Sequence, residues 1–440
     1  MKRTVVITLL IVALLFVLAG IGAVAFFSIR GNGGDFFTGR VQSSATVEES
    51  KTLKVDAKSP VTLNVNDDAG SVTVIGADVN SVQVKAVKTA HATTQARADE
   101  EVNAIKYSIE QTGNTVTLTY QVPHAATNFP NVNVFDLNVD TIDFVITVPN
   151  ETVVYIESSF GDVKVSDIKG DVTIANNFGE VTVGNIEGSL SVNNDNGAVQ
   201  AGGIEAGVGD INLHTGFGKV TLGKANSANI TIDSNSGAIN IDVVRATGSF
   251  SVNTDFGDTT FESGSAASLR IETNSGKVSI TKVNISKELK VDNDFGEIEL
   301  KQTFAGSYDL HTNSGGVTVD GAKNKLKAYT DFGNINIRNA QSVTLDLKTN
   351  SGTVEFSGSL GKGPHMVKSD FGGIDLALPV DSKLNVDLQT DFGNIGSDIP
   401  LTVTFDGGSD KNHQAGTMNG GGDLLTVITN SGGINITAIK

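Results

Sequence analysis

Asn274-Ser275-Gly276-Lys277-Val278-Ser279-Ile280 and Asp294-Phe295-Gly296-Glu297-Ile298-Glu299-Leu300 are two copies of one short unit in the middle of the chain. Each copy is a glycine turn followed by a strand in which apolar and polar residues alternate. Such triplets recur with their glycines 18 to 20 residues apart, and Asn-Ser-Gly takes turns with Asp-Phe-Gly. A short, fixed period with a glycine in every copy is typical of a solenoid. The sequence therefore predicts an all-β protein, a parallel β-helix or β-solenoid with rungs of ~19 residues.

The triplets define a turn ladder of glycines, each preceded by asparagine or aspartate. Its members are Asn235, Gly237, Asp255, Phe256, Gly257, Asn274, Gly276, Asp294, Phe295, Gly296, Asn313, Gly315, Asp331, Phe332, Gly333, Asn350, Gly352, Asp370, Phe371 and Gly372. Glycine supplies a positive φ that a Cβ would obstruct. In a parallel stack, equivalent positions lie ~4.8 Å apart, so an unbroken aspartate column would repel itself. Alternation places an amide donor between carboxylates, which predicts a structural role for the ladder.

Phenylalanine and serine alternate in the neighbouring column of the same turns. A large side chain above a small one suits packing between rungs, and we expect Phe295 to be buried there. The alternative is that the phenylalanines are exposed and form a binding stripe.

Rungs of this kind extend from residue 151 to residue 440. A glycine-rich segment at 406–423 interrupts them between strands expected at 401–405 and 424–428. We interpret this segment as an inserted loop. Because insertions in repeat proteins collect on binding faces, it is a candidate functional insertion, and a disordered spacer is the other interpretation.

The N-terminus has the features of a membrane segment. Residues 1–3 carry two basic side chains and form a short cytoplasmic tip, and the uncharged run 4–29 exceeds the ~20 residues that a transmembrane helix needs. The positive-inside rule then places the body outside the cytoplasm. A cleaved signal peptide is the alternative, because Ala23-Val24-Ala25 matches a cleavage pattern and would release a secreted form after Ala25.

Two further regions precede the rungs. Residues 30–50 are polar and glycine-rich, which predicts a linker. Residues 51–150 alternate as strands do, with one helical stretch at 92–107 and a long loop at 123–138.

Composition excludes several classes of function. The 440 residues contain no cysteine and carry a formal charge of −17. There is therefore no disulfide framework and no cysteine-based zinc site. The acidic balance argues against binding to nucleic acid or to an anionic lipid surface. Six scattered histidines show no ligand spacing.

Catalytic chemistry is also not indicated. The Asp-Phe-Gly triplets lack the other motifs of protein kinases and are better explained as turns. No rung differs from its neighbours as a grafted acid–base site would. We predict no cofactor and no metal, although a divalent cation along the aspartate column stays an alternative, because carboxylate and amide oxygens suit calcium.

Several copies of the unit resemble a known family, the bacterial envelope proteins called the putative-adhesin domain of unknown function. The resemblance rests on Asn66-Asp67-Asp68-Ala69-Gly70-Ser71-Val72-Thr73-Val74, Ser158-Ser159-Phe160-Gly161-Asp162-Val163-Lys164-Val165, Asn313-Ser314-Gly315-Gly316-Val317-Thr318-Val319 and Thr429-Asn430-Ser431-Gly432-Gly433-Ile434-Asn435-Ile436. It covers residues 53 to 440. It implies an exported, often membrane-tethered β-solenoid and supplies no catalytic residues.

We therefore expect a membrane-anchored, extracytoplasmic rod with a non-catalytic role in adhesion or envelope scaffolding. Its partners would be the membrane, through the N-terminal helix, and cell-surface glycans or envelope proteins, which repeated weak contacts can hold tightly. Two alternatives remain open. One is an envelope polymer that self-associates through its ends, and the other is a rod that binds or cleaves polysaccharide.

Overall fold

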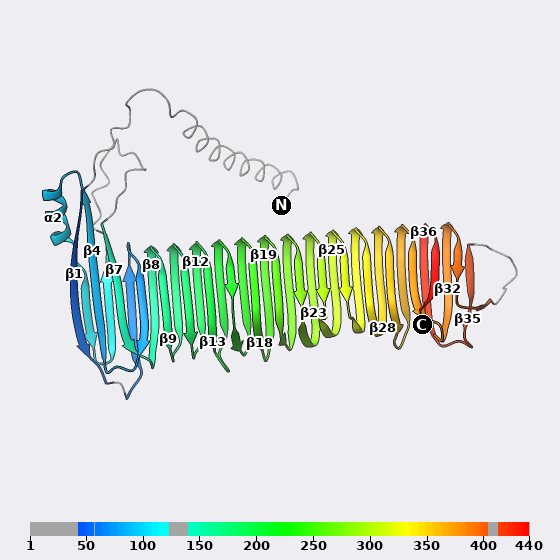
Figure 1. Ribbon diagram of the computed structural model, residues 1–440, viewed down its shortest axis with the longest axis horizontal. Helices are drawn as coiled ribbons and strands as arrows, with labels where there is room; N and C mark the ends of the chain where they lie inside the picture. The colour runs from blue at the N-terminus through cyan, green and yellow to red at the C-terminus, as the bar shows by residue number, and fades with distance from the viewer. Residues whose placement is uncertain (1–42, 57, 123–139, 404–411, 440) are drawn as a thin grey trace, which may run out of the picture.

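The structure, a computed structural model, describes residues 43–56, 58–122, 140–403 and 412–439. It is a long all-β rod in which strands stack side by side along the axis (Figure 1). The predicted β-solenoid is therefore confirmed. The predicted cytoplasmic tip and transmembrane helix lie outside the described residues, as do residues 30–42 of the predicted linker. Within the described part of the chain, no helix is long and apolar enough to cross a membrane.

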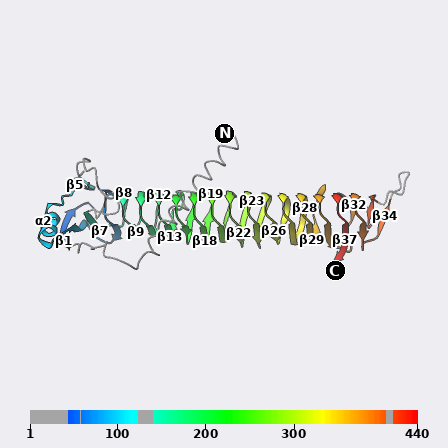
Figure 2. The same ribbon diagram turned by 90° about the horizontal axis from the view of Figure 1, so that it is seen from above.

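Each regular rung consists of two strands joined by a glycine turn, so the rod has two faces. Viewed from above, the two strands of a rung lie in two separate layers (Figure 2). Strands of one layer pair in parallel with the equivalent strands of the next rung, as β19 does with β21 and β20 with β22. The strands that end at the glycine turn are β8 (Thr152–Phe160), β10 (Val172–Phe178), β12 (Leu190–Asn196), β14 (Ile211–Phe217), β17 (Ile230–Ser236), β19 (Ser249–Phe256), β21 (Ser268–Ser275), β23 (Val283–Phe295), β25 (Phe304–Ser314), β27 (Lys323–Phe332), the second part of β28 (Ile335–Ser351), β30 (His365–Phe371), β32 (Leu384–Phe392) and β36 (Asp423–Ser431).

The second layer begins after the turn. Its strands are β9 (Val163–Ile168), β11 (Val181–Ile186), β13 (Val199–Glu205), β15 (Val220–Leu222), β16 (Ala225–Ser227), β18 (Ile239–Ala246), β20 (Thr259–Ala266), β22 (Val278–Thr281), β24 (Ile298–Lys301), β26 (Val317–Asp320), the first part of β28, β29 (Val354–Leu360), β31 (Ile374–Pro379), β33 (Ile395–Ser397) and β37 (Ile434–Ile439). We call the edge of the rod formed by the glycine turns the turn edge, and the other edge the opposite edge.

The core fills the narrow space between the two layers. Val278 and Ile280 from one layer and Leu289 and Val291 from the other are fully buried, while Ser279 and Lys290 between them are partly exposed. This is the alternation that a strand with one wet face requires. The predicted apolar positions of the rung 277–291 therefore form the core.

The N-terminal end of the rod departs from the simple stack. β2 (Val61–Asp67) lies between β6 (Thr115–Tyr120) and β8, and β3 (Val72–Ala77) lies between β7 (Thr141–Pro149) and β9. Antiparallel strands then cover this end: β5 (Ser108–Thr112) pairs with β6, β4 (Ser81–Ala92) pairs with β7, and β1 (Ser43–Lys54) pairs with β4. The end is therefore closed by antiparallel strands.

Two boundaries predicted for this region are corrected by the structure. The linker 30–50 ends earlier, because β1 begins at Ser43; its alternation was hidden by polar residues on a mostly exposed strand. The helix predicted at 92–107 is shorter, since α2 spans Gln95–Ala104 with Thr94 as its N-cap and only Ala98 and Val102 buried. The predicted loop 123–138 lies outside the described residues.

The C-terminal end reverses the order of the last two rungs. β36 pairs with β30 on one side and with β32 on the other, and β37 lies between β31 and β33 in the same way. The rung of β36 and β37 comes last in the sequence. In space it therefore lies between the rung of β30 and β31 and the rung of β32 and β33. β35 (His413–Met418) runs antiparallel to β32 and to β34 (Leu401–Val403) and covers the tip.

The predicted loop 406–423 is therefore wrong in part. Residues 413–418 form β35, and only 404–411 lie outside the described residues. The glycines of this segment obscured its strand alternation.

Candidate functional site

Glycine is required at the turn edge because neighbouring rungs approach closely. A Cβ at Gly296 would lie 2.1 Å from the carbonyl oxygen of Gly276, and one at Gly333 would lie 1.9 Å from that of Gly315. Gly296 also has a φ of +149°, whereas Gly333 has no positive φ in the left-handed region. The expectation of a positive φ therefore holds for only part of the ladder, and close approach of backbones explains the whole of it.

A buried polar column supports the turn from inside. Thr312 Oγ1 donates to the carbonyl of Gly296 at 3.1 Å, and Thr330 Oγ1 donates to that of Gly315 at 2.9 Å. Asn293 uses its amide in the same way on Gly276, at 2.9 Å. These side chains are buried. This column was not predicted from the sequence, although Ser, Thr or Asn recurs two residues before each Phe or Ser of the turn.

The aspartates and asparagines of the ladder form their own column on the surface. Asn274 Nδ2 donates to Asp255 Oδ1 at 2.7 Å, and Asn313 Nδ2 donates to Asp294 Oδ1 at 2.8 Å. A third such bond joins Asn350 to Asp331. The amides therefore lie between carboxylates, where they reduce the repulsion of an all-aspartate column.

The phenylalanines of the turns are exposed, and the expectation that they pack between rungs is wrong. Phe295 has 61% of its surface exposed, and the turn phenylalanines range from 47% at Phe178 to 80% at Phe392. Strict alternation along β19 would turn Phe256 inward after the buried Phe250, Val252 and Thr254. At the corner this alternation ends, and the ring of Phe256 is exposed to solvent.

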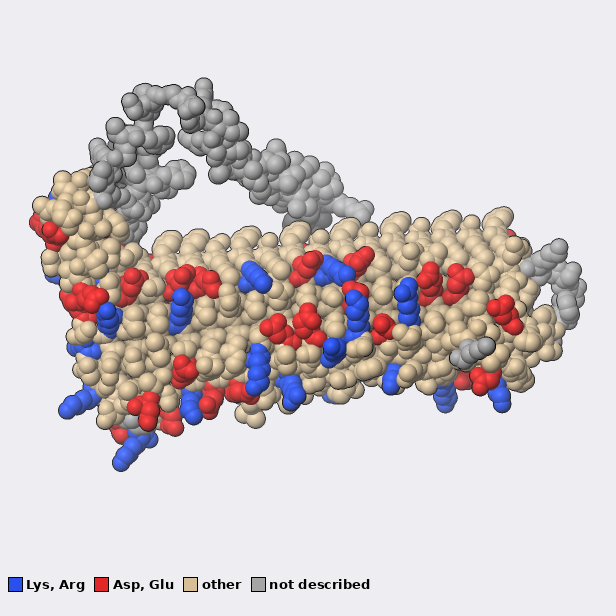
Figure 3. Space-filling view, in the orientation of Figure 1, with Lys and Arg blue, Asp and Glu red and all other residues tan. Residues whose placement is uncertain are grey.

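These rings form one row, which we call the phenylalanine row. The turn position of each rung pairs with the turn position of the next rung. Along most of the row, this position holds a phenylalanine on one rung and Asn196 or a serine on the next. Its members are Phe160, Phe178, Phe217, Phe256, Phe295, Phe332, Phe371 and Phe392. On the face shown in Figure 3, the upper outline of the rod, where β8, β12, β19 and β25 end in Figure 1, is formed mostly by uncharged residues, and both signs of charge lie below it. The aspartates of the turns, such as Asp255, lie directly beside the row.

The alternation of the row is a property of the stack and not of chain order. Two Asp-Phe-Gly triplets follow one another in sequence, at Phe371 and Phe392. In space, Ser431 of the inserted strand β36 lies between them, paired with both. Two consecutive Asp-Phe-Gly triplets are therefore the sequence signal that the last rung is inserted, although this insertion was not predicted.

One place in the row shows what happens when the alternation is absent. Phe160 and Phe178 occupy consecutive rungs, and their rings stack with centroids 5.1 Å apart and planes within 3° of parallel. Phenylalanines on neighbouring rungs are therefore compatible with the fold.

A second group of surface residues lies on the outer face of the layer formed by β23, β25, β27 and the second part of β28. His311 stacks on Tyr329 with centroids 5.1 Å apart, and Lys348 lies 5.3 Å from the centre of the same ring. Lys327 forms an ion pair of 3.1 Å with Asp309. This group was not predicted, because no rung differed from its neighbours in sequence. Its residues lie on different rungs, and the pairing of the strands brings them together. Its charges are paired across rungs, as in a stabilising surface network.

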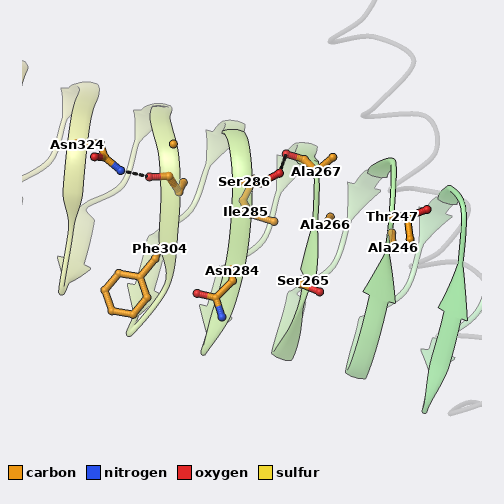
Figure 4. A pocket seen from close by; sticks show the side chains of 12 residues that line it. Ala246, Thr247, Ser265, Ala266, Ala267, Asn284, Ile285, Ser286, Phe304 and Asn324 are labelled. Carbon is orange, nitrogen blue, oxygen red and sulfur yellow. Dashed lines mark hydrogen bonds between the residues drawn. The ribbon is translucent and has the colours of Figure 1, made fainter.

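A hollow of about 540 Å³ lies over successive rungs around β20, β23 and β25. Small residues such as Ala246, Ala266 and Ala305 make it shallow, and Asn324 donates to the carbonyl of Ala305 at 2.8 Å (Figure 4). Its lining contains no acidic, basic or histidine side chain. The hollow therefore offers no group for acid–base catalysis.

Asp67 and His365 are buried ionisable residues whose pKa values are shifted by their surroundings. Burial raises the pKa of Asp67 to about 8, and the nearby Asp143 and Asp68 add to the effect, while a backbone hydrogen bond from Ala69 opposes it. Burial also lowers the pKa of His365, whose Nδ1 accepts from the backbone N–H of Leu345. Asp67 pairs with Ser158 and so belongs to the buried polar column. Among the described residues, no three histidine, aspartate or glutamate side chains lie close enough together to hold a metal ion.

The chain is similar to two solved structures and to one protein family. Among solved structures, one named a "putative cell adhesion protein" from Clostridium sporogenes ATCC 15579 is 11% identical, with a TM-score of 0.21, and covers 90% of this chain and 100% of its own. Another, named a "putative adhesin" from Bacteroides fragilis NCTC 9343, is 13% identical, with a TM-score of 0.29, and covers 62% of this chain and 97% of its own. No curated protein matches the sequence. The family model described as Toastrack DUF4097 matches residues 62–321 and 262–437, and the chain belongs to this family.

Proposed function

We propose that this chain is a non-catalytic adhesion or scaffolding rod whose contact surface is the phenylalanine row. The single observation that supports this proposal is the exposure of eight phenylalanines in one line along the turn edge. Soluble proteins rarely leave large contiguous apolar patches uncovered, and those that do so use them for interaction. Many equal, weak contacts along a rod also favour multivalent binding, which raises affinity without any single strong site.

The lining of the hollow around β20, β23 and β25, which contains no acidic, basic or histidine side chain, fits this role. The charged group around His311 and Tyr329 is engaged in stacking and ion pairs, and the aspartates of the turn accept hydrogen bonds from asparagines. These groups serve the stack. The row is different because its rings contribute little to the core and remain available to a partner.

We further propose that residues 4–29 anchor the rod in a membrane and that the body faces outward, with release after cleavage near Ala25 as the alternative. A tag at Lys440 that is accessible to external protease, on a chain that stays in the membrane fraction, would support the anchor. A released chain starting at Phe26 would support cleavage.

The contact surface can be tested on cells that display the full chain. A variant carrying Phe256→Ser, Phe295→Ser and Phe332→Ser removes the centre of the row, and Phe304→Ser removes a partly exposed phenylalanine that is not in the row. Adhesion to other cells, to envelope glycans and between the displaying cells themselves is measured. We expect the row variant to lose adhesion and the Phe304→Ser control to keep it, with unchanged circular dichroism for both. Equal adhesion by the row variant would contradict the proposal.

A further inference from the structure

We propose that the partner of the phenylalanine row is a second copy of this chain, whose own row interdigitates with it. This inference rests on the proposed function and names the partner of the same surface. The rings of one rod would enter the gaps above the serines of the other. The result would be two rods joined along their turn edges.

The spacing of the row matches its own rings. Paired strands lie ~4.8 Å apart, so phenylalanines on every second rung stand ~9.6 Å apart. A ring placed midway between two of them would lie ~4.8 Å from each, inside the 4.5–7 Å range that aromatic pairs prefer. Phe160 and Phe178 show this arrangement within one chain, where consecutive rings stack at 5.1 Å. Interdigitation would continue the same stack along the rest of the row.

The serines between the rings supply the room that an incoming ring needs. Ser275, Ser314 and Ser351 pair with a phenylalanine on each side along the stack. Steric conflict between rings does not force this alternation, because Phe160 and Phe178 occupy neighbouring rungs. The C-terminal end keeps the alternation by inserting Ser431 between Phe371 and Phe392. Regular gaps in an exposed aromatic row therefore fit a surface built to receive another row.

The area of the row is sufficient for a stable pair. A phenylalanine side chain buries roughly 150–250 Å² when it is fully covered. Between 47% and 80% of each ring is exposed in the single rod, which leaves on the order of 100 Å² per ring to be covered. Eight rings then supply about 800 Å² per copy, which is the size of a standard interface.

Charge sets the conditions for pairing. Each copy carries a formal charge of −17, and Asp255, Asp294 and Asp331 flank the row. Two copies therefore repel one another at long range, and salt screens that repulsion. Pairing through rings should consequently strengthen as salt concentration rises, whereas pairing through ion pairs would weaken.

Because the chain has no cysteine, pairing can be measured by cross-linking through single introduced cysteines. The full chain in its native membrane receives Ser314→Cys on the turn edge or, as a control, Thr247→Cys, which is exposed on the opposite edge. A short thiol-to-thiol reagent is then added. We expect a covalent dimer from Ser314→Cys and none from Thr247→Cys. Equal dimer from the two positions, or none from either, would overturn the inference.

A gap-filling variant separates interdigitation from general stickiness. Ser236→Phe, Ser275→Phe and Ser351→Phe are added to the Ser314→Cys chain, and the matched control carries alanine at the same three positions. Filled gaps admit no partner rings, so we expect the dimer to disappear in the phenylalanine variant and to persist in the alanine control. If filling the gaps increases the dimer instead, the contact is non-specific and the inference is wrong.

Failure of this inference can be told apart from failure of the proposed function. If no dimer forms while the unaltered chain binds an extended envelope glycan and the row variant does not, the row is still the contact surface and its partner is a sugar chain. If the row variant also behaves as the unaltered chain in every adhesion assay, the proposed function fails together with the inference.

Discussion

Two phenylalanines on one strand offer a direct comparison of an exposed and a buried ring. β19 carries Phe250, which is 1% exposed, and Phe256 at the turn, which is 52% exposed. Cutting a buried phenylalanine to alanine costs about 3–5 kcal/mol, because the transfer free energy is lost and a cavity remains. Full burial of such a side chain is worth about 1.5–3 kcal/mol, so half-burial at Phe256 corresponds to roughly 1–1.5 kcal/mol and leaves no cavity.

We therefore expect Phe250→Ala to destabilise the rod at least twice as much as Phe256→Ala. Urea unfolding followed by circular dichroism measures both, on the same strand and with the same chemical change. Similar losses at the two positions would mean that the ring of Phe256 is packed between rungs, and the reasoning about an exposed row would be refuted. Unchanged slopes against urea are the control that the unfolding transition itself is the same.

Three further predictions concern the turn edge and the buried acid. The pKa of Asp67 is raised to about 8 in the folded rod, above the ordinary aspartate value of about 3.9 in the unfolded chain. The folded state is therefore favoured at low pH and loses about 1.4 kcal/mol per pH unit between those two values, so Asp67→Asn should remove this slope in unfolding midpoints measured from pH 4 to pH 8. Gly296→Ala should destabilise the rod by more than Gly113→Ala, because nothing lies within 4 Å of a Cβ at Gly113; equal shifts in melting temperature would contradict the close approach of rungs. Asn313→Asp would place three carboxylates on consecutive rungs and should cost up to about 1 kcal/mol at low salt, with recovery at high salt; a loss that salt leaves unchanged would argue against repulsion.

The period of the sequence was sufficient to predict the stack, because each rung repeats the same local chemistry. Val278 and Ile280 alternate with polar residues, and the glycines recur where the backbones meet. Each of these features depends on neighbours only a few residues away or one rung away. A regular repeat therefore carries its own three-dimensional register.

The direction of the turn phenylalanines could not be predicted in the same way. Alternation along β19 points Phe256 inward, but the alternation ends at the corner and the ring is exposed. Where the alternation ends is a property of the corner and not of the strand. The group around His311 and Tyr329 was missed for a related reason, since its members are separated along the chain and meet only across rungs.

The two ends of the rod were the hardest parts to predict. β1 carries mostly polar residues because only one of its faces meets the protein, and it therefore resembled a linker. The insertion of β36 between β30 and β32 is a choice of topology that no local propensity encodes. In the sequence, the insertion is marked by two consecutive Asp-Phe-Gly triplets. They become informative only when phenylalanine and serine are assumed to alternate along the stack.

Hydroxyl-radical footprinting with mass spectrometry tests the central claim most directly, because it reports the exposure of each phenylalanine with and without a partner. Isolated, undimerised chain is compared with chain engaged in adhesion, and Phe304, which lies outside the row, is the internal reference. We expect Phe256, Phe295 and Phe332 to be oxidised readily in the isolated chain and to become protected during adhesion, while the oxidation of Phe304 is unchanged. Rings that resist oxidation in the isolated chain, or that remain equally reactive during adhesion, would contradict the claim that the phenylalanine row is an exposed contact surface.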